Sequence, residues 1–185
     1  PYTRALLSAV PEPDPSAETE GVTLRGTPPS PRDPPVGCPF TPRCQVKIRP
    51  EGFGAVDDET WERVEVFREA LRGRERTDRS LSERARELLG MDTRFASVEE
   101  VVGELFSDRE LPTEIRNPVE HAADLAREGD EEAALDHLRG ELGSVCDREP
   151  PAAAEVDENG RVSRCHRHEV GHEEPAEFGP TVGRD

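Results

Sequence analysis

The segment from Thr27 to Pro42, TPPSPRDPPVGCPFTP, is dominated by proline, and it limits the fold of this chain more than any other stretch. Each proline fixes its own φ angle and lacks an N–H, so an α-helix cannot run through the segment. An extended, polyproline-like path is favoured instead.

The composition indicates a small core. The chain has 185 residues, enough for one ordinary domain or two very small ones, yet only 32% are apolar and 4% aromatic, against 35% charged. Such a chain can bury little apolar surface to offset the conformational entropy lost on folding. We therefore expect compact pieces joined by extended, poorly packed chain.

The net charge of −17 is spread along the chain. It fits either disorder driven by charge or the acidic surface of a protein adapted to high salt, in which carboxylates hold water and ions. Salt adaptation, as in a halophile, is favoured because Lys47 is the only lysine and every other basic residue apart from histidine is arginine. No basic stripe is present to meet phosphates, so we expect no nucleic-acid partner.

The sequence has no run of eighteen apolar residues and no signal peptide at its start, so we expect no membrane-spanning helix and a reducing environment. It begins at Pro1, inside the helical pattern PYTRALLSAVP, which is typical of a fragment of a longer protein. Apolar residues at helical spacing in residues 1–11 predict a short amphipathic helix that docks on a body outside this sequence. The alternating stretch GVTLRG predicts one strand.

Residues 57–144 carry the signals of a small acidic helical module. The start signals are Asp57 with Asp58, the capping boxes Ser80/Glu83 and Ser97/Glu100, the pair Asn117-Pro118, and Asp130 after Gly129. The first helix bears an apolar stripe that predicts a buried face, formed by Trp61, Val64, Phe67 and Leu71. Further on, DENG at 157–160 predicts a hairpin with Asn159-Gly160 at its tip. After about His172 we expect disorder.

The four cysteines are the one group of residues with clear chemical content. Cys38 and Cys44 are separated by five residues that include two prolines, so a stiff turn can hold both thiolates toward one point. Cys146 and Cys165 flank the predicted hairpin, which could bring the second pair together. Four thiolates at one point suit tetrahedral zinc or an iron–sulfur cluster, and the C-x5-C spacing, longer than zinc modules usually have, favours the cluster.

Alternatives to this metal site stay open. A histidine of the run CHRHEVGH, first of all His166, could replace a cysteine in a zinc site, although the run also fits a solvated polar tail. The cysteines could instead be buried thiols, or Cys38 and Cys44 could form a disulfide. Nucleotide-binding and catalytic motifs are absent, including G-x-x-x-x-G-K-S/T, G-x-G-x-x-G, G-x-S-x-G and H-E-x-x-H, so this stretch alone is not expected to hydrolyse a nucleotide.

The residues before Gln45 resemble a known family, the C-terminal extension of the ATP-binding subunits of oligopeptide and dipeptide ABC transporters. The family motif H-P-Y-T-x-x-L-L is matched from Pro1 to Leu7. The run P-S-P-x-x-P-P-x-G-C-x-F-x-P-R-C is matched from Pro29 to Cys44. The resemblance covers about residues 1–44 and 146–168. In the family the third cysteine usually follows the second closely, whereas here a module that resembles nothing we can name intervenes.

The resemblance implies a 4Fe-4S cluster held by Cys38, Cys44, Cys146 and Cys165, which structures or regulates the tail. It also implies a parent subunit, with ATP and Mg²⁺ bound outside this stretch, that works peripherally at the cytoplasmic face of the membrane. Its implied partners are its own nucleotide-binding domain, a second ATPase subunit, two membrane permeases and an external substrate-binding protein.

The expected fold is mostly α, with irregular proline-rich segments and a small helical module inserted in a short-stranded, metal-stapled extension. Residues 1–44 would begin the transporter extension, 45–145 form the inserted acidic module, 146–172 carry the second cysteine pair and hairpin, and 173–185 form a disordered tail. The alternative is a stand-alone zinc-binding interaction module without ATPase function.

Overall fold

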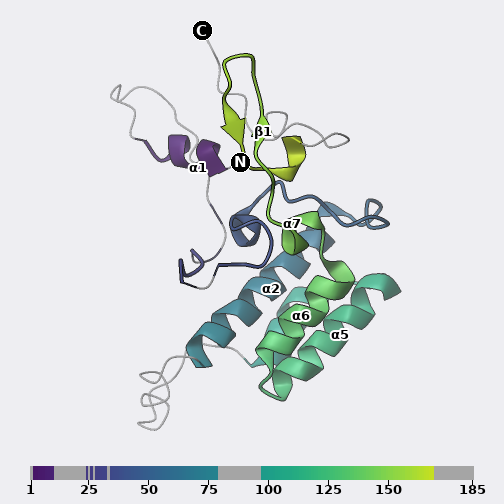
Figure 1. Ribbon diagram of the computed structural model, residues 1–185. Coiled ribbons are helices and arrows are strands. Elements are labelled where there is room, and N and C mark those ends of the chain that lie inside the picture. Colours follow the sequence, from purple (N-terminus) through teal and green to yellow (C-terminus); the bar gives the residue numbers. More distant parts are fainter. Residues whose placement is uncertain are drawn as a thin grey trace, which may run out of the picture. The chain divides into compact units, whose positions relative to one another are not determined.

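The computed structural model of the protein describes residues 2–10, 24, 26, 28–32, 34–78 and 97–168. The chain divides into two compact units: Pro1–Arg49 with Ser144–Asp185, called here the cysteine unit, and Pro50–Gly143, called the helical unit. The prediction of a mostly α-helical protein is confirmed, because the described strands form one two-stranded sheet (Figure 1). No helix in the described part of the chain is long and apolar enough to cross a bilayer.

The cysteine unit combines short helices with one hairpin. Its described elements are α1 (Tyr2–Ser8), the 3-10 helix η1 (Thr41–Arg43), α7 (Val145–Arg148), β1 (Ala154–Glu155), β2 (Val162–Ser163) and the 3-10 helix η2 (His166–His168). The predicted N-terminal helix is confirmed as α1. The predicted hairpin is confirmed too: β1 pairs antiparallel with β2, and Gly160 in the turn has a φ of 72°, which a residue with a Cβ rarely adopts.

The helical unit contains α2 (Asp58–Asp78), α4 (Val98–Phe106), α5 (Thr113–Arg127) and α6 (Glu131–Leu142). Helix α2 starts where the sequence predicted, because the carboxylate of Asp57 accepts hydrogen bonds from the amide and hydroxyl of Thr60, both at 2.8 Å. The predicted stripe on α2 is confirmed as core, since all four of its residues, Trp61, Val64, Phe67 and Leu71, are buried.

The capping predictions for α4 and α6 are confirmed. The Ser97 hydroxyl accepts a hydrogen bond from the amide of Glu100, and the Glu100 carboxylate accepts one from the amide of Ser97. The Asp130 carboxylate accepts a bond from the amide of Ala133 at 2.9 Å. The turn before α6 requires Gly129, whose φ is 84°.

The predicted start of α5 at Asn117-Pro118 is wrong. The helix begins at Thr113, and Pro118 lies inside it, where it removes one backbone hydrogen bond. Burial explains the earlier start, because Ile115 and Val119 lie one helical turn apart and are 0% and 2% exposed. The apolar face of α5 thus outweighs the local effect of the proline.

A buried arginine fastens α2 to the end of α6, which lies beside it in Figure 1. Arg68 is 2% exposed and donates hydrogen bonds to the carbonyls of Leu138, at 3.1 Å, and Leu142, at 2.8 Å. Leu142 is the last residue of α6, so its carbonyl has no partner within that helix. The guanidinium also forms an ion pair with the buried Glu65, with 2.7 Å between Nη1 and Oε1.

Three predictions fall wholly or largely outside the described residues. These are the capping box Ser80/Glu83 with its helix, the disordered tail after His172, and most of the predicted strand GVTLRG. Of that strand, Leu24 and Gly26 are described, and neither lies in a strand.

Candidate cysteine site

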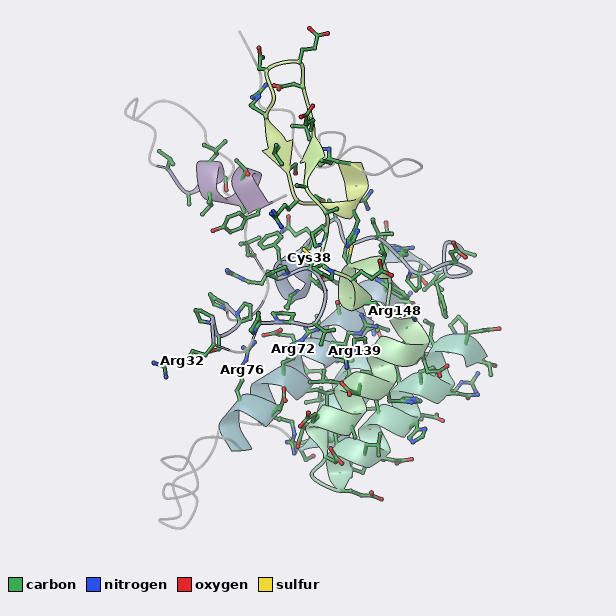
Figure 2. The ribbon with its side chains drawn as sticks, viewed as in Figure 1. Arg32, Cys38, Arg72, Arg76, Arg139 and Arg148 are labelled. Carbon is green, nitrogen blue, oxygen red and sulfur yellow. The ribbon has the colours of Figure 1, made fainter. Side chains whose placement is uncertain are left out.

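A backbone hydrogen bond joins the first cysteine to the third, although 107 residues lie between them in the sequence. The amide of Cys38 donates to the carbonyl of Cys146 at 2.8 Å, and the hydroxyl of Thr41 donates to the same oxygen at 2.6 Å. A carbonyl oxygen has two lone pairs, so both bonds can form at once. Figure 2 labels Cys38 in this region, close to α7, which carries Cys146.

The approach of these two segments depends on Gly37. A Cβ atom at this position would lie 2.3 Å from the carbonyl oxygen of Cys146 and 2.6 Å from the carbonyl carbon of Asp147. Both distances are far shorter than van der Waals contact, and both neighbours are backbone atoms that cannot rotate away. The glycine therefore allows the close approach that brings Cys38 against α7.

The turn between the first two cysteines is short and proline-stiffened. The amide of Thr41 donates to the carbonyl of Cys38 at 2.9 Å, and the amide of Cys44 donates to the carbonyl of Thr41 at 3.3 Å. Pro42 lies in the first turn of η1, where its missing N–H leaves no helical bond unmade. The predicted stiff C-x5-C turn is therefore confirmed.

A buried ion pair fixes the helix of the third cysteine. Lys47 Nζ lies 2.8 Å from Asp147 Oδ1, with side-chain exposures of 3% and 8%. The carboxylate of Asp147 also accepts a hydrogen bond from the amide of Ser144 at 2.9 Å, which closes a capping box at the start of α7. The only lysine of the chain thus ties the segment after Cys44 to the helix that carries Cys146.

The fourth cysteine is held by the residues that follow it. Cys165 precedes η2, and its carbonyl accepts a bond from the amide of His168 at 3.0 Å. Next to it, Nε2 of the buried His166 lies 2.9 Å from the carbonyl oxygen of Glu149. Arg167 donates from Nε to the carbonyl of Val46 at 2.6 Å. These contacts join the segment after Cys165 to the segment after Cys146 and to the segment after Cys44.

Burial is the main influence on the two perturbed cysteine thiols. It raises the pKa of Cys44 to about 11, with smaller contributions from the charges of the other three cysteines and against the lowering effect of the hydrogen bond from the amide of Val46. Burial also raises the pKa of Cys146, with a smaller contribution from Cys38. All four are free thiols of intermediate exposure. Because both pKa values lie above the ordinary value for cysteine, these two thiols are protonated at neutral pH.

The arrangement can be compared with what a metal requires. The donors are soft thiols that are partly shielded from water, a donor type that suits zinc or iron–sulfur chemistry. Within the described residues, however, no three or more His, Cys, Asp or Glu side chains are set out as ligands of one ion. The described residues thus show no preassembled ligand shell, and the metal-stapled part of the predicted fold stays a proposal.

His166, the predicted substitute ligand, already uses Nε2 in its contact with Glu149. The disulfide alternative is not seen either, since Cys38 and Cys44 are free thiols. Sequence reasoning identified all four cysteines but missed the residues that position them: Gly37, Thr41, Lys47 and Asp147. A signal was present for Lys47, because a single lysine among arginines marks a position where a guanidinium does not serve equally well.

Comparison with known proteins finds two families. Residues 58–159 match the family described as Domain of unknown function (DUF8228). Residues 1–49 match the family described as Oligopeptide/dipeptide transporter, C-terminal region. The sequence expectation for the N-terminal part is thereby confirmed at the level of this region. No solved structure matches the chain.

Curated relatives share the N-terminal stretch. A putative peptide import ATP-binding protein of Brucella ovis is 62% identical over 48 residues, which are 26% of this chain and 15% of the relative. The dipeptide transport ATP-binding protein DppF of Haemophilus influenzae is 54% identical over 44 residues, 24% of this chain and 14% of that protein. The chain therefore spans about 15% of the length of the curated relatives that it matches.

Proposed function

Because the chain belongs to the family described as Domain of unknown function (DUF8228) and carries a transporter C-terminal region at residues 1–49, we propose that it is the C-terminal region of the ATP-binding subunit of a peptide ABC importer. The observation that carries the proposal is the similarity of this stretch to peptide import ATP-binding proteins. The shared stretch includes Cys38 and Cys44, so it contains the first half of the cysteine site.

In this proposal Cys38, Cys44, Cys146 and Cys165 hold a 4Fe-4S cluster. When bound, such a cluster would supply positively charged iron that favours thiolates and cross-links the segments bearing them. The support lies in the donor type and in the backbone contact between two of the segments: all four residues are free thiols, and the amide of Cys38 donates to the carbonyl of Cys146 at 2.8 Å.

The residues around the cysteines act by positioning them. Gly37 allows the approach to α7, Thr41 and the amide of Cys38 hold the carbonyl of Cys146, and the ion pair of Lys47 fixes the helix. This set is called the cysteine clasp: Gly37, Cys38, Thr41, Lys47, Cys146 and Asp147. In this proposal the clasp would let the pair Cys38/Cys44 approach the pair Cys146/Cys165, although most of the DUF8228 region lies between the two pairs in the sequence.

Helix α1 would dock the region on the nucleotide-binding domain of its own subunit. Leu6 and Leu7 are 52% and 67% exposed, although both are large apolar side chains that favour burial. On the other side of the helix Ala5 is buried, and the ring of Tyr2 packs on Phe40 with centroids 5.4 Å apart. The helix is thus attached to the cysteine unit and presents a free apolar face.

The whole importer would place this region at the cytoplasmic face of the membrane. ATP and Mg²⁺ would bind in the nucleotide-binding domain, and the partners would be a second ATP-binding subunit, two permeases and an external substrate-binding protein. The acidic, lysine-poor composition supports a salt-adapted host, such as a haloarchaeon, in which screening by salt relieves the repulsion within a charge of −17.

The test of this function is purification together with transport. The natural full-length protein, tagged and extracted with detergent from the membranes of its host, is expected to recover two permeases and a second ATP-binding subunit. Deletion of its gene is expected to abolish uptake of a labelled dipeptide while uptake of an unrelated solute continues. Recovery of the tagged protein without membrane subunits, together with unchanged dipeptide uptake, would overturn the proposal.

A further inference from the structure

Two histidines of the helical unit, which the cysteine site does not involve, are stacked on each other. His121 lies on α5 and His137 on α6, and their ring centroids are 4.2 Å apart with an angle of 40° between the planes. The two helices run side by side in Figure 1. Imidazole nitrogens from two separate helices therefore lie within reach of one small ligand.

The inner histidine has an unused nitrogen. Nε2 of His137 is buried and has no hydrogen-bond partner among the described residues. Buried polar atoms are nearly always paired in native proteins, so an orphan of this kind calls for a ligand, a water or an ion. Among the described residues the ring stacked on it is that of His121, which is exposed.

We propose that His121 and His137 together bind a divalent transition metal ion of the zinc, nickel or copper type. Neutral imidazole is a preferred ligand of these ions, whereas magnesium and calcium prefer oxygen. The ion would bind Nε2 of His137 and one nitrogen of His121 after a small rotation of the exposed ring. No third His, Cys, Asp or Glu completes a ligand set among the described residues, so water fills the remaining positions.

The surroundings favour a cation. On α5 the neighbours of His121 in sequence include Glu120 and Asp124, and on α6 those of His137 include Asp136 and Glu141. Asp124 is paired with Arg127 and Asp136 with Arg139. The whole chain carries −17, which raises the local concentration of cations at low salt. The acidic surface therefore attracts the ion, and the two imidazoles select its type.

Nickel binding by the full chain tests the proposal. The cysteines can also bind metals, so Ni²⁺ titration by calorimetry is done on the wild type, on His121→Gln and on His137→Gln, which share all four thiols. The matched control is the double variant His168→Gln/His172→Gln, which removes two histidines of the C-terminal run instead. Two ligands on one rigid support bind far more tightly than one, so either test variant should lose on the order of a hundredfold in affinity for one nickel ion.

A site-specific readout accompanies the affinities. In NMR spectra of the histidine side chains of the wild type, substoichiometric Ni²⁺ is expected to broaden the ring resonances of His121 and His137 before those of the other histidines. His121 is exposed, so His121→Gln is expected to melt as the wild type does without metal, which separates lost binding from lost folding.

The outcomes are distinct. Affinity lost in both test variants and kept in the control, with broadening at the stacked pair, supports the proposal. Affinity lost only in the control, or nickel bound equally by all variants, would overturn it. The peptide-importer proposal is unaffected by either result, because no residue of the cysteine site is changed.

Discussion

Replacing Gly37 by alanine tests the cysteine clasp with the smallest available change. The added Cβ would lie 2.3 Å from the carbonyl oxygen of Cys146, 2.6 Å from the carbonyl carbon of Asp147 and 2.9 Å from the amide nitrogen of Arg148. Gly37 is not among the described glycines with positive φ, so the backbone angles themselves accept alanine. The effect of the substitution therefore comes from this contact alone.

The expected loss of stability depends on how the structure accommodates the added Cβ. Overpacking of this kind costs about 1–3 kcal/mol. If α7 moves away to relieve the clash, the two hydrogen bonds to the Cys146 carbonyl are lost as well, at about 1 kcal/mol each. The two contributions together should lower the local free energy of opening by about 3–5 kcal/mol. A loss of about 2 kcal/mol would already correspond to about a thirtyfold change in an equilibrium constant.

Hydrogen exchange of the Cys38 amide reads this change directly, because that amide donates to the Cys146 carbonyl. In Gly37→Ala we expect it to exchange at least about thirtyfold faster than in the wild type. The matched control is Gly103→Ala in α4, where a Cβ meets nothing within 4 Å. There alanine should stabilise the helix by about 0.5–1 kcal/mol and leave Cys38 unchanged. Equal exchange at Cys38 in Gly37→Ala and wild type would refute the reasoning.

Three further outcomes are expected. Lys47→Met removes the cation from the buried Asp147 carboxylate and should lower the free energy of unfolding by about 3–5 kcal/mol in chemical denaturation; a loss below about 1 kcal/mol, as for exposed ion pairs, would contradict this expectation. Arg68→Met removes the donor to the Leu142 carbonyl at the end of α6 and the cation beside the buried Glu65, so a loss of similar size, about 3–5 kcal/mol, is expected in the same assay. Arg63, by hydrogen bonding, lowers the pKa of Asp108, so the stability from this pair is present above the unfolded pKa of about 3.9 and is lost as the pH falls below it. Between neutral pH and about pH 3, the melting temperature should therefore fall less steeply in Arg63→Met than in the wild type. Parallel curves for the two proteins would contradict the assignment.

Local signals in the sequence predicted much of the helical unit. Asp57, Ser97 and Asp130 cap helices as expected, because a side-chain oxygen close to free amides acts over three residues and needs no tertiary context. The buried stripe of α2 follows from helical spacing for the same reason. Pro118 was misinterpreted because its local preference for a helix start is weaker than the burial of Ile115, which depends on neighbouring helices.

Contacts between distant residues were not predictable in the same way. In the sequence, Arg68 cannot be told from the arginines on the surface. Its burial is explained by the carbonyl of Leu142 at the end of α6, which accepts a hydrogen bond from its guanidinium. The stacking of His121 on His137 likewise depends on the packing of α5 against α6. The cysteines could be named as candidate ligands because the chain has only four. The cysteine clasp, however, depends on a backbone contact between Cys38 and Cys146, which are far apart in the sequence, and no spacing rule predicts such a contact.

The four cysteines are proposed to share one metal site in the C-terminal region of an importer ATPase. Metal and acid-labile sulfide analysis of the anaerobically purified chain tests it most directly, with Cys146→Ser as the test variant and Gly103→Ala as the control. The account predicts about four iron and four sulfide per chain in the wild type and the control, and loss of both in Cys146→Ser. Stoichiometric zinc without iron would contradict the cluster, and a wild-type protein without bound metal would contradict the shared site itself.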